Sequence, residues 1–174
     1  MTNYADYKPF TMVDGKGVRN AIYFSGCRFA CLGCYNKVAQ NFNYGKEFTQ
    51  DIIGKILDDT DQEYVRGLSV LGGEPFQNID AVLDLICQFR EKFSNSKDIW
   101  VWTGYTIEEL FDLSDDDCRI KSILSNIDIL VDGRFIQSLF IKDLPFRGSQ
   151  NQRIIKVKES IQERSAIIAH EHYQ

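Results

Sequence analysis

Three of the five cysteines lie within eight residues of one another, at Cys27, Cys31 and Cys34. An odd number of cysteines with three in one short cluster indicates metal or redox chemistry rather than a disulfide framework. Cysteine thiolate is the usual protein ligand of a four-iron, four-sulfur cluster. Three thiolates can bind three of its irons and leave the fourth open to the amine and carboxylate of an amino acid. The spacing therefore predicts a reactive cluster with one open iron.

Two closed metal sites compete with this hypothesis. A structural zinc site would combine two of the clustered cysteines with His170 or His172, whose spacing suits zinc poorly. A closed electron-transfer cluster would take Cys87 or Cys118 as its fourth ligand. Cys87 adjoins the apolar stripe of a predicted helix, as is typical of a small buried residue, and Cys118 lies near a predicted helix start. The open cluster is the favoured interpretation.

The elements that must position the cysteines follow from the apolar pattern. We expect strands over Ala21–Gly26, Gly67–Leu71, Asp98–Thr103 and Ile127–Val131. We expect one helix over 49–58, capped by Thr49, and a second over 79–93, capped by Asn78. A third helix should follow the capping box formed by Thr106 and Glu109, and a fourth should run from Ser114 to 124. Alternating strands and helices predict an α/β fold with a parallel sheet and right-handed crossovers.

Distinctive residues follow the carboxyl ends of these strands, which is where ligands bind in parallel sheets. Gly72 and Gly73 form a tight turn or let a ligand approach the backbone, and Glu74 adds negative charge suited to an ammonium group. Thr103 and Asp132 either contact a cofactor or ion or satisfy backbone groups at the strand ends. Four strand ends therefore point to one site.

Three further segments have a structural interpretation. Asp14–Gly17 (DGKG) lacks the spacing of a phosphate loop and is expected to be a hairpin turn. Trp100 and Trp102 alternate with aliphatic residues, which predicts the two faces of one buried strand. Arg147–Arg153 (RGSQNQR) has no periodicity and is either a solvated loop or a lid or docking surface for a partner.

Composition limits the class of protein. A chain of 174 residues with 44% hydrophobic residues is sufficient for one domain with a sizeable core. The net charge of −5 argues against nucleic-acid binding, although Arg147, Arg153, Lys156 and Lys158 could form a local basic patch. No export signal and no apolar run of about 18 residues is recognised, so we expect a cytoplasmic protein without a membrane span.

Five motifs together resemble a known family. They are GCxxxCxGCYN at 26–36, GGEP at 72–75, DIWVWTGY at 98–105, VDGRF at 131–135 and RGSxNQR at 147–153. The cysteine motif resembles the radical S-adenosylmethionine superfamily, and the five together resemble the activating proteins of anaerobic ribonucleoside-triphosphate reductases. The resemblance covers roughly residues 5–153. It divides the chain into a radical S-adenosylmethionine domain, 1–153, and a polar, helical C-terminal tail, 154–174.

The resemblance implies a truncated parallel βα barrel that holds a [4Fe–4S] cluster on Cys27, Cys31 and Cys34, with S-adenosylmethionine as second cofactor. It also implies that the Gly72–Glu74 turn holds the methionine amino group of this cofactor. Gly33, Cys34 and Tyr35 would lie against the cofactor, with Tyr35 near its adenine end.

The resemblance further implies a reaction and its partners. A one-electron donor such as a flavodoxin reduces the cluster, S-adenosylmethionine is cleaved to methionine and a 5′-deoxyadenosyl radical, and this radical takes hydrogen from a glycine of the reductase, a glycyl-radical enzyme. Two alternatives stay open. One is an activase of another glycyl-radical enzyme, of the formate-lyase type, and the other is a non-enzymatic iron–sulfur redox carrier.

Overall fold

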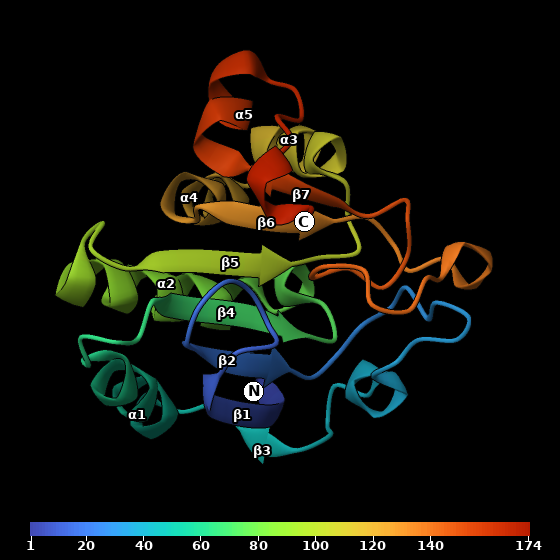
Figure 1. Cartoon of the computed structure of the whole chain (residues 1–174). Helices are drawn as coiled ribbons and strands as arrows, with labels where there is room; N and C mark the ends of the chain where they lie inside the picture. The colour runs from blue at the N-terminus through green and yellow to red at the C-terminus, as the bar shows by residue number, and fades with distance from the viewer.

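The computed structural model describes residues 1–174 and is organised around one sheet of seven strands (Figure 1). The strands are β1 (Asn3–Thr11), β2 (Arg19–Phe24), β3 (Lys46–Glu47), β4 (Gly67–Gly72), β5 (Asp98–Trp102), β6 (Ile129–Asp132) and β7 (Arg153–Lys156). Their order across the sheet is β3-β1-β2-β4-β5-β6-β7, so the sheet is open, with β3 and β7 at its edges. The strands β2, β4, β5 and β6 pair in parallel, as the sequence predicts.

Five α-helices connect or follow these strands: α1 (Gln50–Thr60), α2 (Ile79–Phe93), α3 (Ile107–Asp116), α4 (Cys118–Asn126) and α5 (Val157–Glu163). Short 3-10 turns occur at Lys37–Gln40, Pro75–Gln77, Gln137–Leu139 and His170–His172. The capping box of α3 is present, since Thr106 accepts from the backbone N–H of Glu109 and Glu109 accepts from that of Thr106. None of these helices is both long and apolar enough to cross a bilayer.

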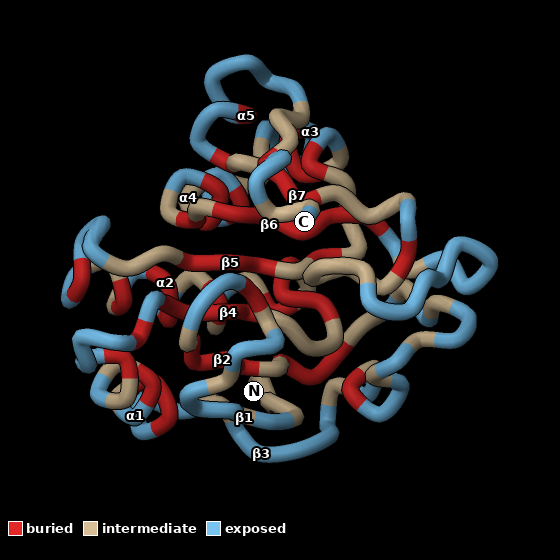
Figure 2. The backbone as a smooth tube through the Cα atoms, in the orientation of Figure 1, coloured by how far each residue is buried: buried red, intermediate tan, exposed pale blue.

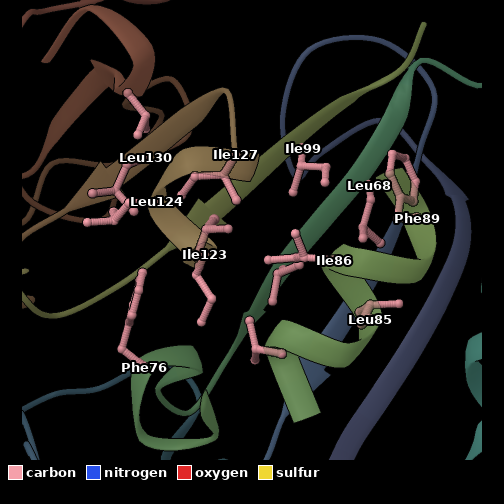
Figure 3. Close-up of a cluster of buried hydrophobic side chains, with 14 of the residues drawn as sticks. Leu68, Phe76, Leu85, Ile86, Phe89, Ile99, Ile123, Leu124, Ile127 and Leu130 are labelled. Atoms are coloured by element: carbon pink, nitrogen blue, oxygen red, sulfur yellow. The ribbon is translucent and has the colours of Figure 1, made fainter. Parts of the chain in front are cut away.

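The main core lies between the helices and one face of the sheet (Figure 3). Ile86 and Phe89 of α2 pack there with Leu68 of β4 and Ile99 of β5, and all four side chains are fully buried. Trp100 lies on the opposite face in a smaller cluster. The alternation predicted for this strand is confirmed, because Ile99 and Trp100 belong to the two different cores.

Several local expectations need correction. Thr49 and Asn78 occupy N-cap positions without a side-chain capping bond, and the Asn78 amide donates instead to the carbonyls of Ser25 and Glu74. The helix expected from Ser114 begins after Asp117, whose carboxylate accepts from the backbone N–H of Arg119. The parallel strands also differ from their expected bounds by one or two residues at several ends.

The antiparallel strands are the larger difference, because the sequence did not predict β1, β3 or β7. The segment Asp14–Gly17 does lie in the connection between the antiparallel strands β1 and β2, as expected for a hairpin. The expected boundary at residue 153 falls inside the sheet, because Arg153–Lys156 forms β7 against β6. Residues 154–157 are not a polar tail, since Ile154, Ile155 and Val157 are fully buried.

The carboxyl ends of the parallel strands all point to the same edge of the sheet, and two long loops project there (Figure 1). We call residues 25–45, between β2 and β3, the cysteine loop, and residues 133–152, between β6 and β7, the β6–β7 loop. Their tips are largely exposed, in contrast to the buried strands from which they start (Figure 2).

Two glycines, one inside a helix and one in the turn after β4, test these packing arguments. We expect Gly54→Ala to raise the free energy of unfolding by about 1 kcal/mol, because Gly54 is inside α1 and an added Cβ meets nothing within 4 Å. Gly73→Ala should lower it by about 1–3 kcal/mol or more, because its Cβ would lie 2.4 Å from the carbonyl oxygen of Gly26. Urea unfolding of the two variants measures both changes, and equal effects would contradict the packing described here.

Candidate functional site

A cavity of about 1190 Å³ opens at the carboxyl ends of the parallel strands, between the cysteine loop and the β6–β7 loop. It is lined by all of the predicted site residues except Asp132: Cys27, Cys31, Gly33, Cys34, Tyr35, Gly72, Gly73, Glu74 and Thr103. The fold therefore brings together residues from the ends of three strands, as the strand-end pattern predicts. A cavity of this size slightly exceeds the roughly 300–1,000 Å³ that is usual for small-molecule sites.

All three clustered cysteines are half-buried free thiols on one wall of this cavity. The loop is fixed at its start by the backbone N–H of Cys27, which donates to the carbonyl of Gln40 at 3.1 Å. Burial raises the pKa of the Cys27 thiol. No three His, Cys, Asp or Glu side chains converge on one point that could hold a single metal ion. A cubane cluster does not require this, because each of the three thiolates binds a different iron.

The donor set therefore fits a cluster held by three thiolates better than either closed site. Cys87 and Cys118 lie on helices and line neither of the two main cavities. Both are exposed, so the expectation that Cys87 is a buried hydrophobic residue is wrong. His170 and His172 lie in the C-terminal 3-10 turn, where His172 packs on the ring of Trp100, and neither lines those cavities.

The Gly72–Gly73 turn packs closely on the end of β2. The backbone N–H of Gly73 donates to Phe24 at 2.8 Å, and that of Glu74 donates to Gly26 at 2.8 Å. Gly72 has φ of +130°, and a Cβ there would lie 2.1 Å from the carbonyl oxygen of Phe24. The missing side chains are thus required by the approach of the chain's own backbone, and the turn holds the base of the cysteine loop against β4.

The carboxylate of Glu74 joins this turn to the end of β5. Its Oε1 accepts from the hydroxyl of Thr103 at 2.7 Å and from the backbone N–H of Phe76 at 2.9 Å, and its Oε2 accepts from the N–H of Gly104 at 2.7 Å. The residue is 1% exposed, and burial raises its pKa to about 7. Three donors offset part of the cost of burying the carboxylate, so its first role is to fix two strand ends.

Thr103 and Asp132 also serve the fold. The hydroxyl of Thr103 donates to Glu74 and accepts from the N–H of Tyr105, so it lines the cavity with its polar atom already engaged. Asp132 does not line this cavity, and its carboxylate accepts from the N–H of Ile107 and from two nitrogens of Arg153. Asp132 lines a second, adjacent cavity together with Phe29 and Cys31, and its contact with a cofactor stays a prediction.

The basic patch expected near the C-terminus is also largely neutralised. Arg153 pairs with Asp132 and Glu108, Lys156 with Glu171, and Lys158 with Asp128. Arg147 differs, because its guanidinium lies over the ring of Tyr173, 4.1 Å from the centroid.

The β6–β7 loop forms the wall opposite the cysteines. Its segment Arg147–Arg153 is ordered by Gln152, whose side chain accepts from the N–H groups of Gly148 and Ser149, and Ser149 is fully buried. Arg147, Gly148 and Gln152 line the cavity. This segment is therefore an ordered part of the cavity wall rather than a freely solvated loop, and its role as a lid or docking surface for a partner stays a prediction.

Phe29 is a site residue that sequence reasoning missed. Its ring lies edge-on to Tyr105 with centroids 4.7 Å apart, and the guanidinium of Arg134 lies 4.4 Å from its centroid. Gly104 leaves the space that the ring fills, because a Cβ there would be 2.5 Å from Phe29 Cδ2. Next to it, the N–H of Arg28 donates to Gln77 Oε1 at 2.8 Å. Phe29 thus anchors the cysteine loop to β5 between two of the cysteines.

This anchor can be tested through Gly104. We expect Gly104→Ala to expel the Phe29 ring and lower iron retained after anaerobic reconstitution by about half or more, because rigidly held ligands bind metal better. Phe29→Ala in the same chain should remove the clash, so that the double variant retains more iron than Gly104→Ala alone. Iron analysis and the visible absorption of the cluster measure this. Additive losses in the double variant would show that Phe29 and Gly104 do not act on each other.

Comparison with known proteins agrees with this site. Residues 13–155 match the model of a 4Fe-4S single cluster domain, and this range includes all three clustered cysteines. The chain is 41% identical over 156 residues to the anaerobic ribonucleoside-triphosphate reductase-activating protein of Vibrio cholerae, which covers 87% of this chain and 96% of the relative. The proteins of the same name from Escherichia coli K12 and phage T4 are 38% and 33% identical, each over 154 residues. They cover 86% and 87% of this chain and 96% and 92% of the relatives. The chain therefore belongs to the family of anaerobic ribonucleoside-triphosphate reductase-activating proteins and carries a four-iron, four-sulfur domain of the radical S-adenosylmethionine type.

Proposed function

We propose that this protein activates an anaerobic ribonucleoside-triphosphate reductase by forming a glycyl radical in it. The observation that carries the proposal is the wall of three free thiols in one large cavity at the strand ends, in a chain of this family. The redox-carrier alternative would need a fourth protein ligand, and the two remaining cysteines are exposed on helices away from this wall.

Cys27, Cys31 and Cys34 would hold a [4Fe–4S] cluster and leave one iron without a protein thiolate. Such a cluster, once reduced, would supply the one electron needed to cleave S-adenosylmethionine reductively to methionine and a 5′-deoxyadenosyl radical. The reducing electron comes from an external one-electron donor such as a flavodoxin. The protein's own contribution is positioning and exclusion of water.

The residues that would position S-adenosylmethionine line the same cavity as the thiols. The Gly72–Glu74 turn would receive its ammonium group, because this turn offers backbone carbonyls beside a buried carboxylate. Thr103 would act through Glu74, whose carboxylate it orients. Gly33, Cys34 and Tyr35, at the third cysteine, would contact the rest of the molecule, and the exposed ring of Tyr35 is free to stack on adenine.

Aromatic side chains form the remaining walls of the cavity. Tyr23, Phe29, Trp102, Phe135 and Phe146 all line it, and Trp102 is fixed by its indole N–H, which donates to the carbonyl of Phe146 at 2.8 Å. Such walls exclude water from a reactive species, and the polar hydrogens of Tyr23 and Trp102 are already donated to Asp14 and to the carbonyl of Phe146. No histidine lines the cavity, which suits a hydrogen-atom transfer that needs no general acid or base.

The open order of the sheet supports a truncated βα barrel as the finer description of the fold. Both edge strands, β3 and β7, have a single partner strand. A barrel that does not close leaves the strand-end face accessible, and the target glycine lies within another protein. A segment of polypeptide that carries this glycine needs such an opening.

The proposal predicts a specific spectroscopic product. Reconstituted, reduced protein mixed with S-adenosylmethionine and the reductase should give 5′-deoxyadenosine and the doublet of a glycyl radical in electron spin resonance. Cys31→Ala should lose both by a factor of about 100 or more, as expected for a lost cluster ligand. The matched control is Cys87→Ala, because this exposed cysteine lies outside the cavity, and it should behave as wild type. Cofactor cleavage without a doublet on this reductase, but with one on a formate lyase, would contradict the proposed partner.

A further inference from the structure

Eight large apolar side chains are exposed on the two loops that enclose the cavity. Six of them belong to two short segments near the loop tips: Leu32, Tyr35 and Val38 on the cysteine loop and Leu139, Phe140 and Ile141 on the β6–β7 loop. Their exposed fractions run from 36% for Leu139 to 103% for Tyr35. We call this set the apolar rim. Single exposed apolar residues need no explanation, but a group of this size around the mouth of a site is typical of a binding surface.

The rim extends over both loops because the loops touch. A Cβ added at Gly33 would lie 2.9 Å from Cδ of Gln137, so the Gln137 side chain packs directly on the cysteine loop. Phe140 also contacts Phe135 within its own loop, with ring centroids 6.3 Å apart. The two loop tips therefore form one surface beside the cavity, and both tips are exposed in Figure 2.

The charge of these loops is opposite to that of the whole chain. Residues 27–45 and 133–152 contain five basic residues and a single acidic one, Asp143, a net charge of +4 in a chain whose net charge is −5. Arg28, Lys37 and Lys142 form no ion pair within the protein. The rim is thus apolar at its centre, with unpaired positive charge around it.

We infer that the apolar rim and its basic residues are the surface on which the reductase docks, through an apolar patch bordered by acidic side chains. The inference rests on the proposed function, which requires a glycine-bearing segment to enter the cavity beside this rim. A protein that enters the cavity must cover the rim. An electron donor needs only to approach the cluster. A symmetric contact between two copies of this chain would bring two positive rims together and is disfavoured.

Paired variants of equal exposure test the inference. Leu139→Glu with Ile141→Glu changes the rim at two residues that line neither main cavity. Leu113→Glu with Ile161→Glu is the matched control, since these side chains, on α3 and α5, are 41% and 39% exposed against 36% and 40% in the rim pair. The contribution of the positive charge is tested with the double variant Lys37→Glu, Lys142→Glu. Its control is Lys121→Glu, at an exposed lysine on α4.

Binding of each reconstituted variant to the reductase is measured anaerobically, together with glycyl-radical yield and 5′-deoxyadenosine formed with a chemical reductant. We expect each rim pair to raise the Kd for the reductase about tenfold or more and to lower the radical yield, because such interfaces depend on a few central residues. Cofactor cleavage should stay within about twofold of wild type. The lysine pair should also weaken the salt dependence of binding. The controls should match wild type.

Other outcomes overturn the inference, each in a different way. Rim variants that bind the reductase as wild type does would place docking elsewhere, while the proposed function stands. Slower reduction by flavodoxin with unchanged reductase binding would assign the rim to the electron donor. Loss of a dimer of this chain with unchanged reductase binding would assign it to a second copy. A wild-type protein that neither binds the reductase nor forms the radical would instead overturn the proposed function.

Discussion

The buried carboxylate of Glu74 is the interaction on which the rest of the site depends. It accepts three hydrogen bonds from the ends of β4 and β5, while its own backbone N–H donates to Gly26 at the start of the cysteine loop. One residue thus fixes three segments that meet only at the edge of the sheet. Removing one partner of such a buried group costs about 1–3 kcal/mol, because the other partner is then left unsatisfied. The position of the thiols relative to the Gly72–Glu74 turn therefore depends on hydrogen bonds of Glu74 that take no part in the reaction.

The same constraint explains why the buried polar side chains at the cavity are already engaged within the chain. Thr103 and Gln152 line it with polar atoms engaged inside the chain, and Asp132, beside it, is held by Arg153. A buried polar group without a partner would destabilise the fold. Thiols do not carry this cost, because a free cysteine behaves as a small apolar residue until a metal binds. The three cysteines can therefore line a half-buried wall, and they are reactive groups that the fold leaves available.

The sequence predicts the parallel part of the fold because each of these strands is a short apolar run buried on both faces. The strand β1 escapes prediction because its residues, NYADYKPFT, are mostly half-buried or exposed at the side of the sheet and show no clean alternation. The strand β7 is only four residues long, with Ile154 and Ile155 as its buried pair. The predicted site residues converge because parallel strands end at one edge. The roles of Asp132 and Phe29 were not predictable in this way, because each depends on a partner far along the chain, Arg153 or Gly104, whose relevance only the tertiary structure reveals.

The two loops at the strand ends are stabilised by different interactions from those that stabilise the sheet. The sheet and helices are stabilised by a continuous apolar core, whereas the cysteine loop is held by a few contacts: the Phe29 ring, the Gly33–Gln137 packing and the hydrogen bonds at its base. Few buried contacts imply a low local free energy of opening. A cluster with three irons bound to the thiolates of this loop would raise its free energy of opening, because the free energy of metal binding adds to that of folding. The loop that carries the chemistry is in this way less stabilised by apolar burial than the sheet, and its exposed apolar tips would be covered by a docked partner.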